Sequence, residues 1–259
     1  MQSKQLLSIV VGFVALGILL GTVGCVTGQG QKKQKEEKQS ADWHYQMGVG
    51  YLNNQKIYPA IRELSKALEM DPKMAKAHFS LGFIYTGRKK YHEAIEHYKE
   101  ALRINPKYHQ ARNNLGSVYL AMERWRDAAE LYEKLSKESM YPNPELAHNN
   151  LGWAQHNLRK YDKAIDNFKQ AIFLKPEMCL AYNNLGLTYE EMGNTSKAVE
   201  NYRKAIRKCP NSYAKPHFNL GKILQNRGEP GARRHFERCV KIDGETNLAD
   251  RCREYLQLR

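Results

Sequence analysis

Residues 75–108 read AKAHFSLGFIYTGRKKYHEAIEHYKEALRINPKY, and the pattern in this stretch recurs about every 34 residues along the chain. Leu-Gly is followed by a Tyr, an Ala, an aromatic residue, a second Ala and a Pro at fixed distances. In residues 75–108 these are Leu81, Gly82, Tyr85, Ala94, Tyr98, Ala101 and Pro106. Six copies of the frame align on Gly48, Gly82, Gly116, Gly152, Gly186 and Gly221. A period of this length is typical of proteins built from stacked helical repeats.

The frame resembles the tetratricopeptide repeat, in which an antiparallel pair of helices, A and B, buries its apolar face only against neighbouring pairs. With the conserved Gly counted as position eight, this Gly and an Ala at position twenty allow helices A and B to approach closely. The Pro ends helix B. The resemblance implies an all-α protein, a right-handed α-solenoid with helix A on the concave side. The predicted repeats are 41–74, 75–108, 109–144, 145–178, 179–213 and 214–246, and residues 247–259 are predicted to form a capping helix.

Composition narrows the possible functions. The 259 residues are 42% hydrophobic and 26% charged, as in folded proteins, and a mean hydropathy of −0.70 excludes a polytopic membrane protein. No phosphate-binding glycine loop, nucleophile elbow, zinc-protease motif or Cys-x-x-Cys pair occurs in the sequence. We therefore expect a binding protein with no catalytic residues, cofactor, metal site or small-molecule substrate.

The first 24 residues resemble a lipoprotein signal peptide. Residues 6–24 carry no charge, and Gly24 directly precedes Cys25, as in a bacterial lipobox. In that pattern Cys25 carries the lipid that anchors the protein to the membrane. The alternative is an uncleaved anchor, because residues 6–26 are 21 uncharged residues, just enough to span a bilayer.

Residues 25–40 are predicted to form a polar tether, since residues 29–39 contain four Lys, two Glu and no apolar residue. The lipoprotein signal peptide and the uncleaved anchor would both place the repeats outside the cytoplasm, so no nucleic-acid partner is expected.

A corner is predicted between repeats three and four. Repeat three lacks its terminal Pro, and residues 141–147 read YPNPELA. Pro142 and Pro144 disfavour helix in the residues before them, so this segment, which begins at Tyr141, should be extended. The array is expected to bend there.

A lipobox, a polar tether, six repeats and this corner together resemble the type IV pilus pilotins, the PilF/PilW and Tgl lipoproteins. The resemblance covers the chain from Cys25 onward. It implies an outer-membrane lipoprotein that binds the secretin PilQ and promotes its localisation and assembly in that membrane. Val26, in place of an Asp, favours the outer membrane. The alternative is a repeat lipoprotein that scaffolds cell-wall enzymes.

One feature of that family is absent. PilF/PilW members often carry a Cys in helix A of repeats three and four, where this sequence has Leu120 and Ala154. That disulfide cannot form here, which favours the Tgl-like branch.

Four cysteines follow Cys25. Cys239 and Cys252 lie on either side of the predicted turn at residues 244–246, so a disulfide between them is expected to hold the capping helix to repeat six. Pairing of Cys179 with Cys209, near the open end of repeat five, is left open, with buried thiols as the alternative.

Asparagines recur at position six of helix A, where tetratricopeptide arrays face their concave groove. An amide both donates and accepts hydrogen bonds, so a row of amides could hold the main chain of an extended peptide. The alternative is that Asn-Asn-Leu-Gly only follows the repeat consensus. The predicted groove residues are Asn114, Asn150, Asn184, Asn219 and the nearby Trp153, whose indole is either a binding hot spot or buried against the corner.

Overall fold

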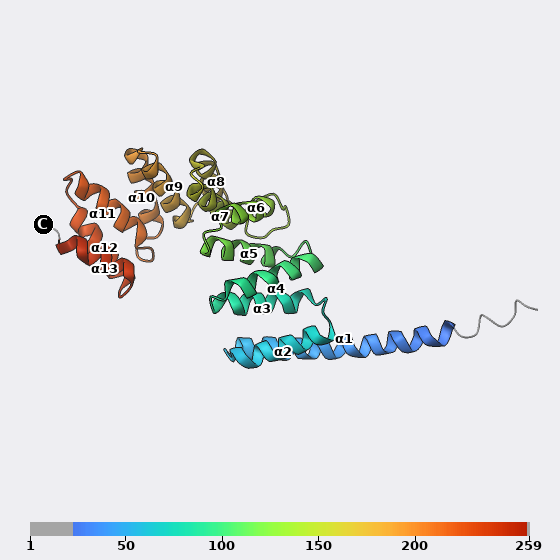
Figure 1. Cartoon of the computed structure of the whole chain (residues 1–259). Helices are drawn as coiled ribbons and strands as arrows, with labels where there is room; N and C mark the ends of the chain where they lie inside the picture. The colour runs from blue at the N-terminus through green and yellow to red at the C-terminus, as the bar shows by residue number, and fades with distance from the viewer. Residues whose placement is uncertain (1–22, 258–259) are drawn as a thin grey trace, which may run out of the picture. The chain divides into compact units, whose positions relative to one another are not determined.

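The computed structural model describes residues 23–257, without the side chains of residues 23–32, 34–35 and 37–38 (Figure 1). Residues 1–22 of the predicted signal peptide and the side chain of Cys25 lie outside this description. In the described residues every regular element is an α-helix, and none of these helices is long and apolar enough to cross a membrane. The chain divides into two compact units, Met1–Ile84 and Tyr85–Arg259, with the boundary inside α3 (Ala75–Gly87).

The first unit contains repeat one. Helix α1 (Val23–Asn53) runs antiparallel to α2 (Ile57–Met70), and Figure 1 shows its N-terminal part extending beyond α2. The predicted tether at residues 29–39 is therefore a continuation of helix A of repeat one. Ala60, Leu64 and Ala67 of α2 are fully buried, and Leu64 lies where a Cβ on Gly48 would be.

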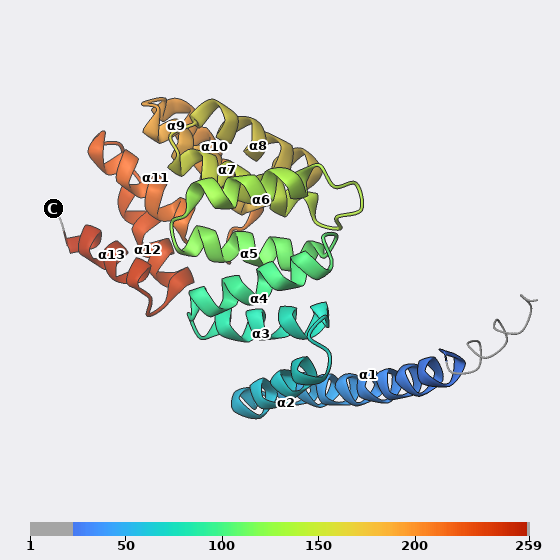
Figure 2. The ribbon, with the colours of Figure 1, turned by 45° about the vertical axis from the view of Figure 1, so that its right-hand side comes forward.

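The second unit is a row of antiparallel helix pairs, each packed on the next (Figure 2). Its complete helices are α4 (Tyr91–Ile104), α5 (His109–Ala121), α6 (Trp125–Ser136), α7 (Pro144–Asn157), α8 (Tyr161–Leu174), α9 (Cys179–Glu191), α10 (Thr195–Lys208), α11 (Lys215–Asn226), α12 (Ala232–Asp243) and α13 (Asn247–Gln257). Odd-numbered helices from α5 to α11 are helix A of their repeats, and α13 packs on α12 as the cap. The prediction of an all-helical solenoid of tetratricopeptide repeats is confirmed.

Close packing within each pair follows from the glycine at position eight. A Cβ built on Gly116, Gly152 or Gly186 would lie within 3 Å of the ring of Tyr132, Phe168 or Tyr202, respectively. These three rings are fully buried. Only a residue without a side chain lets helix A come this close to the aromatic residue of helix B.

The turn between helices A and B adopts a left-handed backbone at position fifteen of every repeat. The residues are Gln55, Lys89, Glu123 and Arg159, with φ of 57° to 58°, and Gly193 and Gly228, with φ of 75° and 63°. A residue with a Cβ is strained in this conformation, whereas glycine is not.

We therefore expect Glu123→Gly to raise the free energy of unfolding by about 0.5–1 kcal/mol, because relief of the left-handed strain exceeds the added chain entropy of the unfolded state. Urea unfolding followed by circular dichroism measures it. Gly193→Ala is the converse control and should be destabilising by a similar amount. A loss of stability in Glu123→Gly would show that the turn carries no strain.

Candidate functional site

The predicted groove residues lie on helices α5, α7, α9 and α11. Asn184 and Asn219 are buried, with 6% and 7% of their surfaces exposed, while Asn114 and Asn150 are partly exposed. The side chains at position six therefore differ in what they present to solvent. We call the face that carries positions two, five, six, nine and twelve of these helices the A-face.

Five asparagines form a continuous chain of side-chain hydrogen bonds, which we call the asparagine ladder. Asn219 Nδ2 donates to Asn183 Oδ1 at 3.1 Å, and Asn184 Nδ2 donates to Asn149 Oδ1 at 3.1 Å. These bonds join α11 to α9 and α9 to α7. Within α9 and α7, Asn183 Nδ2 donates to Asn184 Oδ1 at 3.5 Å and Asn149 Nδ2 to Asn150 Oδ1 at 3.1 Å. In repeats five and six the position-six amide is thus bonded to position five of the preceding repeat.

The ladder changes the interpretation of two predicted residues. Asn184 and Asn219 use their amides to join neighbouring repeats, so in this structure they line the inter-repeat interface and are not accessible to a peptide. A buried amide is stabilised only when it is hydrogen-bonded, and the adjacent asparagines at position five meet that requirement. The prediction of groove contacts for these two residues is corrected accordingly.

The ladder stops at the corner between repeats three and four. Tyr141 is buried, and its hydroxyl lies 3.3 Å from Asn113 Oδ1, the acceptor at position five of repeat three. Asn150, the position-six residue of repeat four, instead accepts from Asn149 and lies near the hydroxyl of Tyr132, whose pKa it lowers. Burial raises the pKa of Tyr132 to about 12, so both phenols remain neutral donors. The corner therefore replaces one link of the ladder with Tyr141.

Further contacts attach the corner to α5. Glu138 forms an ion pair with Arg112 at 3.2 Å, and the ring of His109 meets that of Tyr141 edge to face at 6.0 Å. Pro142 is exposed, whereas Pro144 is the first residue of α7, where a missing N–H costs nothing. Repeat four thus begins from a segment fixed to repeat three, although the spacing from Gly116 to Gly152, 36 residues, is two residues longer than the period.

Trp153 is partly buried on the A-face. Its ring stacks on His156 at 5.1 Å and packs against the core of repeats four and five. His156 Nδ1 lies 3.0 Å from the hydroxyl of Thr188 on α9, and burial lowers the pKa of His156. Because the Thr188 hydroxyl donates to the carbonyl of Asn184, the neutral His156 ring is the donor in this pair.

Two exposed leucines were not predicted from the sequence. Leu146 and Leu180 stand at position two of α7 and α9 and are 37% and 38% exposed. The other repeats carry polar residues at this position: Asp42, Lys76, Gln110 and Lys215. Comparison of equivalent positions would have revealed the difference. Phe173, 79% exposed at position twenty-nine, stands out in the same way, because the equivalent residues are Glu69, Arg103, Lys137, Arg207 and Lys241.

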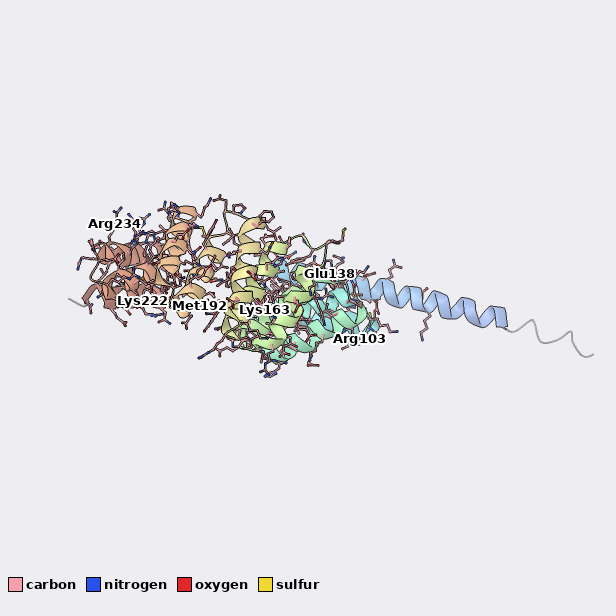
Figure 3. The ribbon with its side chains drawn as sticks, turned by 90° about the horizontal axis from the view of Figure 1, so that it is seen from above. Arg103, Glu138, Lys163, Met192, Lys222 and Arg234 are labelled. Carbon is pink, nitrogen blue, oxygen red and sulfur yellow. A yellow bond between two sulfur atoms is a disulfide. The ribbon has the colours of Figure 1, made fainter. Side chains whose placement is uncertain are left out.

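Lys222 is the one basic residue at position nine of the A-face. Its ammonium lies 3.8 Å from Glu190, which also accepts a hydrogen bond from the Tyr202 hydroxyl. Figure 3 shows Lys222 on the opposite side of the C-terminal repeats from Arg234. A residue already paired with a carboxylate is a weak site for the carboxylate of a partner.

Both cysteine pairs are disulfide-bonded. Cys239–Cys252 links α12 to the cap α13, and Cys179–Cys209 links the start of α9 to the residue after α10. The first pair is fully buried and the second is partly exposed. The Cys179–Cys209 bond closes the open end of the α9–α10 hairpin, whereas Cys239–Cys252 joins α12 and α13 within their lengths. Both bonds restrict the unfolded chain.

Histidines at position four of helix A face polar side chains of helix B. His44 lies 2.7 Å from Glu63, His148 lies 2.8 Å from Asn167, and His217 Nδ1 lies 2.9 Å from His235 Nδ1. In the part of the chain that the structure describes, no group of three or more His, Cys, Asp or Glu side chains is placed to hold a metal ion.

The His217–His235 pair should make the protein sensitive to acid. Burial, His235 and the nearby Arg238 and Arg234 lower the pKa of His217 to about 4. Between pH 6.5 and pH 4, His217 is protonated in the unfolded chain but stays neutral in the folded chain. The free energy of unfolding should therefore fall by about 2 kcal/mol between pH 7.5 and pH 5.

Urea unfolding at these two pH values measures that loss. His217→Phe should remove most of it, since the variant has no imidazole to protonate at this position. The matched control is His148→Phe, which should keep the pH dependence of the parent. An unchanged pH dependence in His217→Phe would assign it to other groups.

Comparisons with known proteins agree with this geometry. A family model described as tetratricopeptide repeat matches residues 75–108, 146–178 and 179–212, and a second one matches residues 111–142, together about half of the chain. The crystal structure of PilW, a widely conserved type IV pilus biogenesis factor, is similar with a TM-score of 0.70 and 21% identity, over 82% of this chain and 97% of PilW. Pseudomonas aeruginosa PilF is similar with a TM-score of 0.65 and 20% identity, over 85% of this chain and 99% of PilF.

A third similar structure is YrrB, described as a protein with an unusual peptide-binding site, with a TM-score of 0.61 and 25% identity over 70% of this chain and 92% of YrrB. No curated protein sequence matches the chain significantly. At the identities found for PilW and PilF, the likeness shows a shared fold.

Proposed function

Because the chain belongs to the tetratricopeptide-repeat proteins, we propose that it is a protein-binding factor of type IV pilus biogenesis, an outer-membrane lipoprotein that binds the secretin PilQ and promotes its assembly. In this proposal the lipid on Cys25 sets the location and the repeats recognise the partner. Binding alone is required, and no bond is made or broken.

The observation that carries the proposal is agreement in length and organisation with two pilus biogenesis proteins. The similarity extends over 97% of PilW and 99% of PilF. The lipobox at Gly24–Cys25 and the corner at Tyr141 are sequence features that support the same assignment.

Within the A-face, accessible side chains are the best candidates for partner contacts. Leu146, Leu180 and the exposed part of Trp153 are apolar, and they lie on α7 and α9, as does the partly exposed Asn150 of α7. An extended segment with apolar side chains at alternate positions would match this surface, because its main chain could reach the amide while its side chains cover the leucines.

The first experiment deletes the gene and asks whether PilQ still forms detergent-resistant multimers in the outer membrane. We expect monomeric or mislocalised PilQ, restored by the wild-type chain but not by Cys25→Ser. Normal multimers in the deletion strain would reject this function and favour the alternative adaptor of cell-wall enzymes.

A second experiment locates the binding surface. Leu146→Ser combined with Leu180→Ser should weaken retention of purified PilQ at least tenfold without changing the helical content. Phe173→Ser is the matched control, because it also removes an exposed apolar side chain but from position twenty-nine of helix B. Equal retention by the double variant and the control would place the interface elsewhere.

A further inference from the structure

The later repeats bury a side of helix A that repeat one leaves open. In α9, Ala181 at position three packs with Ala171 of α8, and Leu185 at position seven packs with Phe168 of α8. Helix α8 is helix B of the preceding repeat. The residues at positions three, seven and ten are buried in all of repeats two to six. This side of helix A is therefore the surface on which repeats stack.

No repeat precedes α1 in the described chain, and the same side of α1 is exposed. Trp43 at position three is 58% exposed, and Met47 at position seven is 36% exposed. At position ten, a Cβ built on Gly50 would meet no described atom within 4 Å. Because these positions are four and three residues apart, they follow one line along the helix. We call the line of Trp43, Met47 and Gly50 the α1 edge.

The residues of the α1 edge differ in size from their equivalents. Position three is Ala or Pro in repeats two to six, whereas repeat one has Trp43. Position ten is Ile, Val, Ala or Thr in those repeats, whereas repeat one has Gly50. Neither residue benefits a solvent-exposed helix, because glycine weakens the helix and an exposed indole leaves apolar surface in water. The edge thus carries a large ring at one end and no side chain at the other.

We propose that the α1 edge is the interface of a two-fold dimer in which α1 packs antiparallel to α1 of a second copy. A two-fold axis beside Met47 places Trp43 of each copy over Gly50 of the other, because the two residues lie on either side of that axis. The ring then occupies the space that Gly50 leaves free. The two Met47 side chains meet near the axis, where their flexible thioethers can pack around the rings.

The opposite end of the array does not supply the missing contact. Helix α13 packs on α12 and is joined to it by Cys239–Cys252. The exposed residues of α13 include the charged Asp250, Arg251 and Glu254. This polar cap disfavours a head-to-tail assembly in which the last repeat of one copy would cover α1 of the next. A closed, symmetric pair covers both edges at once.

Sedimentation equilibrium of the full chain in density-matched detergent tests the dimer. We expect a reversible monomer–dimer equilibrium in the micromolar range, since a contact between two helices is small beside a standard protein interface. Trp43→Ala should weaken dimerisation about tenfold or more because the ring is lost, and Gly50→Leu should do the same because the space is filled. Phe173→Ala, which removes an exposed ring from α8, is the matched control and should leave the equilibrium unchanged.

The double variant tests the antiparallel pairing itself. Combining Trp43→Ala with Gly50→Leu moves the large side chain from one end of the edge to the other. In an antiparallel pair the introduced leucine again faces a small residue of the second copy, so dimerisation should recover to within about threefold of wild type. In a parallel pair like positions face each other, and the two losses would add.

Folding is measured separately, at concentrations far below the dissociation constant of the dimer. There Gly50→Leu should unfold at the same or a higher urea concentration than wild type, because its side chain begins in open space and leucine favours helix. A variant that dimerises poorly is then not simply misfolded.

Three results would overturn the proposal: a monomer at all concentrations up to about 100 μM, a dimer that Gly50→Leu does not weaken, or no recovery in the double variant. The proposal goes beyond the proposed function and does not depend on it. Normal PilQ multimers in the deletion strain would reject the pilus assignment and leave the dimer standing, and a strictly monomeric chain would reject the dimer alone.

Discussion

Replacing Gly186 with alanine should lower the free energy of unfolding by about 3 kcal/mol. The new Cβ would lie 2.6 Å from Cε1 and 2.8 Å from Cδ1 of Tyr202. Tyr202 is fully buried and its hydroxyl is bonded to Glu190, so the ring cannot swing away without losing that bond. Helices α9 and α10 must separate instead, which opens gaps along their interface.

Urea unfolding followed by circular dichroism measures this effect, and Gly50→Ala is the matched control. Gly50 lies inside α1 and a Cβ there would meet nothing within 4 Å, so this variant should gain up to about 1 kcal/mol from helix propensity. A small loss in Gly186→Ala, comparable to the change in the control, would contradict the steric explanation.

Replacing Asn183 with leucine should also be strongly destabilising, by about 4 kcal/mol. Asn183 is only 1% exposed and is the member of the asparagine ladder that connects Asn219 to Asn184. Its loss leaves the donor of Asn219 and the acceptor of Asn184 buried without their partners. Two unsatisfied polar groups then remain on the buried side chains of Asn184 and Asn219.

The ladder predicts how a second substitution should act. Adding Asn219→Leu to Asn183→Leu removes the unpaired donor of Asn219. The loss in free energy of unfolding of the double variant should therefore be smaller, by about 1 kcal/mol or more, than the sum of the losses of the two single variants. Asn226→Leu, on the exposed end of α11, is the control and should change stability little. Strict additivity of the two changes would show that the ladder hydrogen bonds do not stabilise the interface.

The two predictions differ in their origin. The role of Gly186 follows from the sequence, because glycine at position eight recurs opposite an aromatic residue at a fixed spacing and a helical hairpin brings those positions together. Repeat boundaries were predictable for the same reason: Pro72, Pro106, Pro176 and Pro210 each follow the extended residue that ends a helix B. The Cys239–Cys252 pair was also expected from its symmetry about one turn.

Other features depend on contacts between repeats, 34 to 36 residues apart. The sequence placed asparagines at position six, but whether they face a groove or a neighbouring helix depends on the angle at which repeats stack. Tyr141 became a link to Asn113 only because the corner folds back onto α5.

Local signals therefore determined this protein's helices, their pairing and the number of repeats, since each depends on residues within one hairpin. The tertiary structure decided which polar side chains are buried in hydrogen bonds between repeats and which stay accessible to solvent. Burial of an amide is set by the distance between helices, and that distance results from the packing of all their side chains together.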